Sequence, residues 1–280
     1  MILVTGATGN IGTELVPLLL AKGKSVRVVT RDEAKATRLD PRVEKQMGDL
    51  TDRATVRRAV AGVERVFMVS LIRDESGDSD RMLIEEAARA EATHIVKISA
   101  LSVGGGRVGV LHRDRERAVR ESGLAWTFLR PGMFMANSLG WAPTIKAQGQ
   151  VFSATGDGKV AAISPSDIAA VAALVLTERG HEGQAYELTG PELLSAPEQV
   201  AILSRVIGKP IACIDIPIEA AAERMKKMGA PDFLVEGLSE FWRTIKAGNA
   251  AVQTEEVARL TGRPAQSYEA WCVAHQAAFV

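Results

Sequence analysis

The segment Thr5-Gly6-Ala7-Thr8-Gly9-Asn10-Ile11-Gly12 constrains the fold most strongly. It follows a short β-branched run and opens an amphipathic stretch that reaches Ala21. In a strand–turn–helix unit, the first glycine permits the sharp turn, the second lets the backbone approach a pyrophosphate, and the third allows the helix to pack closely on the sheet. The helix N-terminus adds free N–H groups and the positive end of its dipole. This context favours a dinucleotide-binding turn over a simple tight turn. The residues expected to contact the dinucleotide are Gly6, Thr8, Gly9, Asn10, Ile11 and Gly12.

Strand-like and helix-like segments alternate through the first half of the chain. After the strand at residues 2–5, further strands are expected at 26–30, 43–47, 66–69, 94–98 and 126–129, with helices at 11–21, 51–60, 82–90 and 113–121. Strands that alternate with helices at this spacing predict an α/β fold with a doubly wound parallel sheet, the Rossmann architecture.

The pattern is looser beyond Pro131-Gly132. Residues 133–145 predict a broken helix, 186–189 one more sheet strand, 210–217 another strand, and 219–280 a mostly helical region. The segment Ser195-Ala196-Pro197-Glu198 has the pattern of a capping box at a helix start. We therefore expect a dinucleotide-binding domain over residues 1–190, with 133–160 contributing to the substrate side, and a small, mostly helical C-terminal cap over 191–280.

Composition excludes several classes of protein. The 280 residues carry 34 basic and 34 acidic side chains, and this balance argues against a nucleic-acid partner. Cys213 and Cys272 are too few and too far apart for a disulfide framework or a metal site. No targeting signal opens the chain, and no apolar run is long enough for a membrane span. We expect a cytoplasmic protein without metal or membrane contact, for which a homodimer is compatible with the sequence.

The residues after the second and third strands bear on the choice of dinucleotide. Arg31 comes first after the second strand, and a guanidinium suits a 2′-phosphate. Asp32 is the alternative, because an acid there takes ribose hydroxyls and selects NAD; either residue is also compatible with a solvated loop. The position of Arg31 favours NADP(H) over NAD(H). Asp49 and Leu50 are placed to flank the adenine, and Asp49 is equally suited to capping the next helix.

Several segments together resemble a known family. The chain is similar to the NmrA-like atypical short-chain dehydrogenases, and within them to bacterial NAD(P)H:quinone reductases and triphenylmethane-dye reductases. The resemblance implies a reductase for quinones, dyes or similar flat acceptors, or a cofactor-sensing regulator. The resemblance extends over almost the whole chain, and the segments that carry it are 4–12, Arg31, 48–49, 122–132, 177–183, 185–189 and 231–248.

The usual proton relay of short-chain dehydrogenases is missing. That relay needs a Tyr with a Lys four residues later. Tyr186 is followed at that spacing by Gly190, and Tyr268 by Cys272. Neither tyrosine can serve.

Ser99 and His112 remain as candidate catalytic residues. Ser99 ends the fifth strand, and the carboxyl ends of parallel strands bind ligands. The resemblance implies that His112 stands where the isoflavone-reductase branch has a catalytic Lys before the Gly-x-x-x-Thr segment, here Gly123 to Thr127. His112 could hydrogen-bond the nicotinamide ribose or donate a proton, since its ordinary pKa is near neutrality. The alternative is a solvated histidine that heads the helix at Arg113.

The remaining expected site residues surround the nicotinamide. Val69, Ser70, Ser99, Pro131, Gly132 and Phe134 are expected on the cofactor side. Met133, Phe134, Met135 and Trp141 could form an apolar wall for a small aromatic acceptor, although core packing explains them nearly as well. The leading hypothesis is an NAD(P)H-dependent oxidoreductase that transfers hydride without a Tyr–Lys pair. The alternative is a non-catalytic NAD(P)-binding redox sensor.

Overall fold

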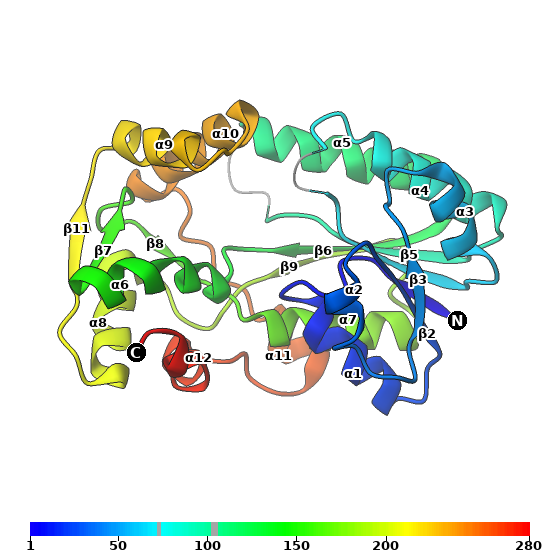
Figure 1. Ribbon diagram of the computed structural model, residues 1–280, viewed down its shortest axis with the longest axis horizontal. Coiled ribbons are helices and arrows are strands. Elements are labelled where there is room, and N and C mark those ends of the chain that lie inside the picture. The colour runs from blue at the N-terminus through cyan, green and yellow to red at the C-terminus, as the bar shows by residue number, and fades with distance from the viewer. Residues whose placement is uncertain (72–73, 102–105) are drawn as a thin grey trace. The chain divides into compact units, whose positions relative to one another are not determined.

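The structure is a computed structural model that describes residues 1–71, 74–101 and 106–280 (Figure 1). It contains two compact units, each assembled from separate stretches of the chain. Unit 1 comprises residues 1–100, 111–131 and 165–187, and unit 2 comprises 101–110, 132–164 and 188–280. The sequence predicts a different division, into a cofactor-binding domain that ends at residue 190 and a cap on the substrate side, and this division by function stays a prediction.

A seven-stranded sheet carries unit 1, in the order β3-β2-β1-β4-β5-β6-β9. Its paired strands from β3 to β6 are parallel, as the alternation of segments predicts. The order reverses between β1 and β4, and this switch point is where doubly wound sheets bind their ligands. The strands are β1 (Ile2–Val4), β2 (Val26–Thr30), β3 (Glu44–Met47), β4 (Arg65–Met68), β5 (His94–Ile98), β6 (Ala125–Pro131) and β9 (Gln184–Leu188).

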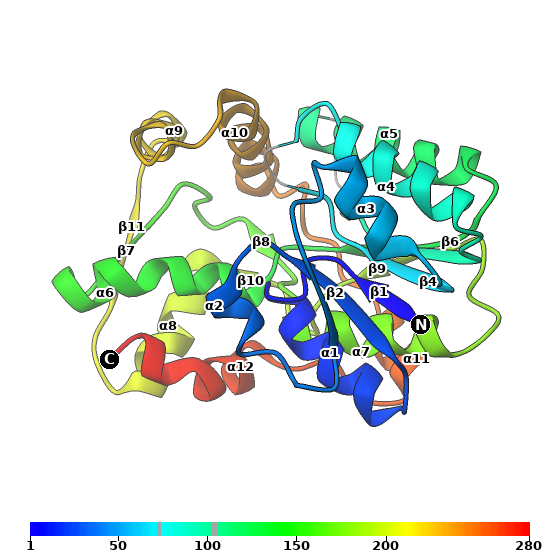
Figure 2. The same cartoon turned by 45° about the vertical axis from the view of Figure 1, so that its right-hand side comes forward.

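Helices cover both faces of this sheet. Figure 1 shows α3, α4 and α5 over one face, and Figure 2 shows α1 and α7 side by side over the other. The core on the α3–α4 face is formed by residues such as Val56, Leu83, Ile95 and Phe128. The helices are α1 (Gly12–Ala21), α2 (Glu33–Ala36), α3 (Arg53–Val60), α4 (Asp78–Arg89), α5 (Arg107–Glu121) and α7 (Pro165–Thr177).

Two helices begin earlier than the sequence predicts. α4 starts at Asp78 rather than Met82, because Gly77 adopts a left-handed conformation before it and Asp74 accepts bonds from the N–H groups of Gly77 and Ser79. α5 starts at Arg107 rather than Arg113. The expectation that His112 heads this helix was therefore wrong, since it lies inside α5.

Unit 2 combines helices with two small two-stranded sheets. The predicted break between residues 133 and 145 is present as a change from a 3₁₀ helix to an α-helix at Ala142. The capping box at Ser195 and Glu198 is confirmed. The elements are η1 (Met135–Trp141), α6 (Ala142–Gln148), β7 (Gln150–Ser153), β8 (Lys159–Val160), β10 (Leu194–Ser195), α8 (Ala196–Ile207), β11 (Ala212–Asp215), α9 (Ile218–Lys227), α10 (Asp232–Lys246), α11 (Glu256–Thr261), α12 (Tyr268–His275) and η2 (Gln276–Ala278).

The core of unit 2 gathers around Trp271. Trp271, Tyr268 and Phe279 are almost fully buried, with Val200 and Leu203 of α8 beside them. The strand pair β7–β11 is parallel, with Val151 opposite Cys213. The mostly helical C-terminal region expected from the sequence is confirmed.

Candidate functional site

The turn between β1 and α1 has the backbone that a dinucleotide requires. Gly6 adopts a φ of +66°, which side chains other than glycine rarely tolerate. A Cβ at Gly12 would lie 2.3 Å from the carbonyl oxygen of Gly6, so only glycine fits there. Among the described residues, a Cβ at Gly9 would meet one atom within 4 Å, the same oxygen at 3.3 Å. The turn therefore has the tight backbone that its glycines predict, and its role in holding a pyrophosphate stays a prediction.

The N-terminus of α1 adds hydrogen-bond donors to this turn. Ile11 precedes the helix without a side-chain cap, and within the described residues the N–H groups of Asn10 and Ile11 donate to no other backbone group. Thr8, Gly9 and Asn10 reach the surface, whereas the Ile11 side chain is buried. Free N–H groups at a helix start bind phosphates, so the residues present fit a pyrophosphate.

Arg31 and Asp49 lie together beyond β2 and β3. Arg31 Nη1 is 3.1 Å from Asp49 Oδ2, and the arginine side chain is 80% exposed. The other carboxylate oxygen accepts from the backbone N–H and hydroxyl of Thr51, and these bonds, with that from Arg31, hold the pKa of Asp49 below its usual range. Asp49 thus caps a turn, and Leu50 packs on the sheet core.

Asp32, the candidate for NAD selection, already has a local partner. Its side chain accepts from the backbone N–H of Lys35 at 3.0 Å and caps α2. This bond, with the nearby Lys35 ammonium, lowers the pKa of Asp32. One of its carboxylate oxygens is therefore occupied by the first turn of α2, whereas the Arg31 guanidinium remains largely open to solvent.

Val69 and Ser70 follow β4 at the switch point. Thr5 links this segment to β1, because its hydroxyl donates to the carbonyl of Phe67 and accepts from the N–H of Val69. A Cβ at Gly6 would come within 3.4 Å of Val69, so the β4 end lies directly beside the glycine turn. The structure thereby brings together two groups of residues that are more than 60 positions apart in sequence.

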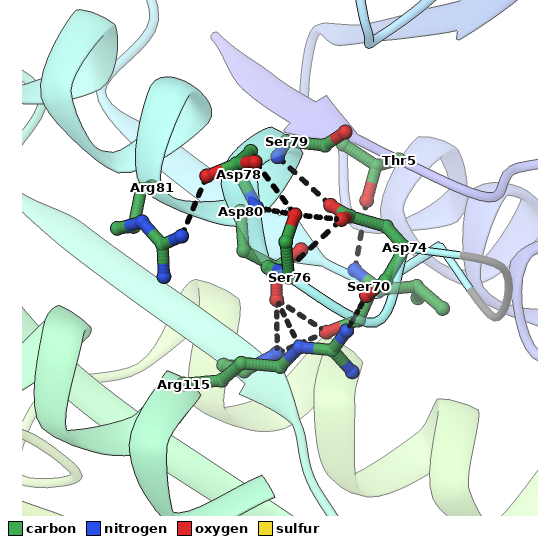
Figure 3. A network of polar contacts seen from close by, with 12 residues as sticks. Thr5, Ser70, Asp74, Ser76, Asp78, Ser79, Asp80, Arg81 and Arg115 are labelled. Atoms are coloured by element: carbon green, nitrogen blue, oxygen red, sulfur yellow. Dashed lines mark hydrogen bonds and ion pairs between the residues drawn. The ribbon is translucent and has the colours of Figure 1, made fainter. Parts of the chain in front are cut away.

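Ser70 belongs to a polar cluster that the sequence analysis missed (Figure 3). Its hydroxyl donates to Asp80 Oδ2 at 2.6 Å and accepts from Lys97 Nζ at 2.5 Å. Asp80 also lies 3.3 Å from Lys97 Nζ and 3.4 Å from Arg115 Nε. The signal was a lysine within the otherwise apolar strand segment Ile95-Val96-Lys97-Ile98.

Ser99 is tied to a second buried cluster. Its hydroxyl donates to Glu116 Oε1 at 2.7 Å, and Arg130 binds both oxygens of the same carboxylate at 2.9 and 2.7 Å. Arg120 adds a bond at 3.0 Å. Burial opposes ionisation of Glu116, but these partners outweigh it and lower its pKa. The proton of the Ser99 hydroxyl is thus held by Glu116.

His112 is half-buried in α5 rather than solvated at a helix start. Burial, together with the positive charges of Lys97 and Arg115, lowers its pKa to about 4. Its Nδ1 is enclosed and has no hydrogen-bond partner within the described residues. The side chain is therefore neutral near pH 7 and retains an unused hydrogen-bonding atom.

The expected acceptor-side residues lie in unit 2, apart from Pro131, which ends β6. Gly132 donates to the carbonyl of Leu188, and Met133 and Met135 bond the backbone of Ile163. Met135 is 1% exposed, whereas Met133, Phe134 and Trp141 are half-buried. This placement assigns Met135 to the core. Phe134 and Trp141 pack against the same core and Met133 packs against the cluster around Ile245, each with part of its surface exposed.

Both tyrosines are engaged elsewhere. Tyr186 shares a hydrogen bond with His181 Nδ1 at 2.8 Å. Tyr268 shares one with Ser138 Oγ at 2.7 Å, and burial raises its pKa. In the described part of the chain no group of three or more His, Cys, Asp or Glu side chains could hold a metal ion. None of the described helices has the length and apolarity that a membrane crossing needs.

Known proteins are similar to this chain over most of its length. A family model described as NAD(P)H-binding matches residues 6–179. An NAD(P)H azoreductase from Xenophilus azovorans is 38% identical over 283 residues, which cover 100% of this chain and 99% of the relative. Quinone oxidoreductase 2 of Escherichia coli strain K12 is 29% identical over 270 residues, covering 94% of each chain.

Solved structures with the same fold superpose on almost the whole chain. The NADPH-dependent quinone oxidoreductase of Escherichia coli, complexed with NADPH, superposes with a TM-score of 0.86 at 29% identity and 99% coverage of both chains. The triphenylmethane reductase of a Citrobacter species, complexed with NADP(H), gives a TM-score of 0.84 at 26% identity, covering 98% of this chain and 99% of that one. With its glycine turn, its switch point and these likenesses, the chain belongs to the NAD(P)H-binding family.

Proposed function

We propose that this protein is an NADPH-dependent reductase of small, flat aromatic acceptors such as quinones and dyes. The observation that carries the proposal is the β1–α1 turn, where Gly9 leaves room for a pyrophosphate and the start of α1 offers unpaired N–H groups. The names of the relatives support the acceptor class, since they include an azoreductase, a quinone oxidoreductase and a triphenylmethane reductase.

Specific residues would hold the cofactor. The backbone of residues 6–12 would bind the pyrophosphate, with Val69 and Ser70 at the adjacent strand end. Arg31 would bind a 2′-phosphate, because its exposed guanidinium can form paired, charge-assisted bonds. Asp49 and Leu50 would flank the adenine, and Ser99, Pro131, Gly132 and Phe134 would complete the nicotinamide side. When bound, the cofactor supplies hydride.

The choice of NADP(H) over NAD(H) is supported by the partners of two neighbouring residues. One carboxylate oxygen of Asp32 is used to cap α2, while among the described residues Arg31 is held by one exposed ion pair, with Asp49. A dianionic phosphate competes well for such an arginine. Both NADPH and NADP(H) complexes occur among the similar structures.

His112 and Ser99 have different roles in this proposal. His112 is neutral near pH 7, so it would serve as a hydrogen-bond partner rather than as a proton source. Its Nδ1 is enclosed, so a ligand hydroxyl would reach His112 through the other ring nitrogen. The Ser99 hydroxyl donates a hydrogen bond to Glu116 and the residue is only 5% exposed, so we assign it a contact with the cofactor and not the release of a proton. Neither therefore replaces the missing tyrosine as a general acid.

The acceptor would be held by apolar contact. Met133, Phe134 and Trp141 are half-buried and supply flat or polarisable surface. Positioning against the cofactor supplies much of the rate for a hydride transfer. A cytoplasmic location and a homodimer stay predictions of the sequence.

Two measurements test the function. NADPH oxidation should be detected with a quinone, an azo dye or a triphenylmethane dye, and the absence of turnover with all three classes would refute it. Gly12→Ala should abolish NADPH binding, since its Cβ would overlap the Gly6 carbonyl. Gly140→Ala is the matched control, because its Cβ would meet no described atom within 4 Å. Tight NADPH binding without turnover would instead favour a redox sensor.

A further inference from the structure

Lys97 is a completely buried cation at the carboxyl end of the central strand β5. Its side chain is 0% exposed, and it pairs in register with Met68 on β4 and Phe128 on β6. Burying an ammonium is strongly unfavourable unless partners compensate for the lost hydration. A neutral side chain could anchor the loop at Ser70 by a hydrogen bond without this unfavourable burial of charge.

Among the residues that the structure describes, the groups that face Lys97 do not neutralise the cluster. Asp80 of α4 is shared between Lys97 and Arg115 of α5, so two cations face one carboxylate. Glu116 also acts on Lys97, but its oxygens are bonded to Arg130, Arg120 and Ser99. His112 adds no charge near pH 7. Burial outweighs the attraction of Asp80 and lowers the pKa of Lys97, which makes its proton easier to release.

The direction of the hydrogen bonds leads from Lys97 to Ser70. Lys97 can only donate, so Ser70 Oγ accepts from it at 2.5 Å and turns its own O–H to Asp80. Ser70 is half-buried and stands one residue beyond Val69, which borders the glycine turn. Ser70 is thus the member of this cluster that adjoins the switch point, and its O–H has to turn away from Asp80 to reach a ligand there.

We propose that the Ser70 hydroxyl delivers the proton that completes reduction of a neutral acceptor, and that Lys97 replaces this proton from the interior. The proposal rests on the proposed reductase function. Ser70 is its catalytic residue, whereas Lys97 acts through Ser70 and Asp80 orients both.

The step balances for a quinone. The acceptor gains an electron pair as hydride from NADPH, and its oxygen becomes an anion. The Ser70 O–H bond breaks as that oxygen takes the proton, and a new O–H bond forms at Ser70 with the proton of the Lys97 ammonium. Lys97 is left as a neutral amine. Because it is enclosed, it regains its proton through Ser70, which takes one from a hydronium ion of the solvent after the product has left and before the next turnover.

Two acceptors of different charge separate this role from a structural one. A quinone needs both hydride and proton, whereas a cationic triphenylmethane dye becomes neutral on accepting hydride alone. In single turnovers, Ser70→Ala and Lys97→Met should slow quinone reduction about 100-fold, as expected for loss of a general acid. Their effect on the dye should be at least about tenfold smaller. Ser70→Thr, which keeps a hydroxyl, should restore most of the quinone rate.

Lys22→Met is the matched control, because Lys22 is an exposed lysine paired only with Glu178 among the described residues. It should leave both rates unchanged. Equal losses with the two acceptors in Ser70→Ala would overturn the proposal and assign Ser70 to loop anchoring. If the wild-type protein reduces no acceptor at all, the proposed function fails instead.

A second measurement needs neither cofactor nor turnover. In protein labelled with ¹³C at the lysine ε-carbons, the Lys97 signal is identified by its loss in Lys97→Met. Ser70→Ala should shift this signal and the pH at which it titrates, while the Lys22 signal stays in place. If the chemical shift and the titration midpoint of the Lys97 signal are the same in Ser70→Ala as in the wild type, the proposed direct proton transfer from Lys97 to Ser70 is wrong. Ser70→Ala removes one oxygen atom from a half-buried residue, so we expect this variant to fold. It therefore tests the proposal even if Lys97→Met does not fold.

Discussion

Arg31 Nη1 lies 3.1 Å from Asp49 Oδ2, while Asp49 Oδ1 accepts from the backbone N–H of Thr51. One carboxylate therefore both holds the arginine and caps the turn after β3. The arginine is 80% exposed, so its ion pair contributes little to stability. The ion pair positions Arg31 but binds it weakly, so an anion of higher charge, such as a phosphate, can replace Asp49 as its partner.

Arg31→Ala should weaken NADPH binding by about 10- to 100-fold, the usual range for charge-assisted hydrogen bonds to a charged group. NADH binding should change by less than about threefold, because NADH lacks the 2′-phosphate. Fluorescence titration of both nucleotides measures the difference. Arg38→Ala, an exposed arginine after α2, is the control. An equal loss for both nucleotides would remove Arg31 from the 2′-phosphate site.

His94 is expected to make folding stability depend on pH. Burial, then the positive charge of Arg65, lowers its pKa to about 4 from 6.5. The unfolded chain binds this proton more readily, so the stabilisation is complete above pH 6.5 and is lost as pH falls towards 4. Between pH 7 and pH 5 the loss should be about 2 kcal/mol from this residue alone.

The hydrogen bonds around His94 support its neutral form. The hydroxyl of Thr127 donates to the carbonyl of His181, so it accepts from His94 Nε2, and Nδ1 is left enclosed and unpaired among the described residues. Urea unfolding at both pH values measures the effect. His94→Leu should make unfolding less sensitive to pH, and an unchanged sensitivity would contradict the assignment.

The sequence predicts the sheet and the glycine turn because both depend on local patterns. Apolar runs bounded by turn residues mark each strand, and Gly6, Gly9 and Gly12 have fixed roles within one turn. The capping box at Ser195 is likewise readable from four consecutive residues. Such features need no knowledge of distant contacts.

The buried ionic clusters could not be predicted in the same way. Glu116 looks like one more charge on a charged helix, and only the packing of α5 on β5 and β6 brings it to Ser99 and Arg130. The burial of His112 depends on where α5 begins, and the start at Arg107 has no clear signal in the sequence. Of these residues, only Lys97 has a local signal in the sequence, because it is a cation within an apolar strand segment.

Glu116→Gln should reduce the free energy of unfolding by about 3 kcal/mol at pH 7, because it leaves Arg130 and Arg120 facing a neutral amide. The pKa of Glu116 is lowered, so its contribution is present above its ordinary value and is lost as pH falls below it. The difference between variant and wild type should therefore shrink in acid. Urea midpoints at pH 7 and in mild acid measure it, with the exposed Glu121→Gln as control. A constant difference at both pH values would show that Glu116 is not ionised in the fold.

Trp141 and Met135 lie in the same segment of unit 2 but should respond differently to truncation. Met135 is 1% exposed and contacts the core around Trp271, so Met135→Ala should lower stability by about 2–5 kcal/mol. Trp141 is half-buried, and Trp141→Ala should mainly raise the KM for a flat acceptor while the Kd for NADPH is retained. Steady-state kinetics with a quinone and thermal unfolding of both variants separate the two effects. If Trp141→Ala lowers stability as much as Met135→Ala and leaves the KM unchanged, Trp141 is a core residue and the acceptor wall must be formed by Met133 and Phe134.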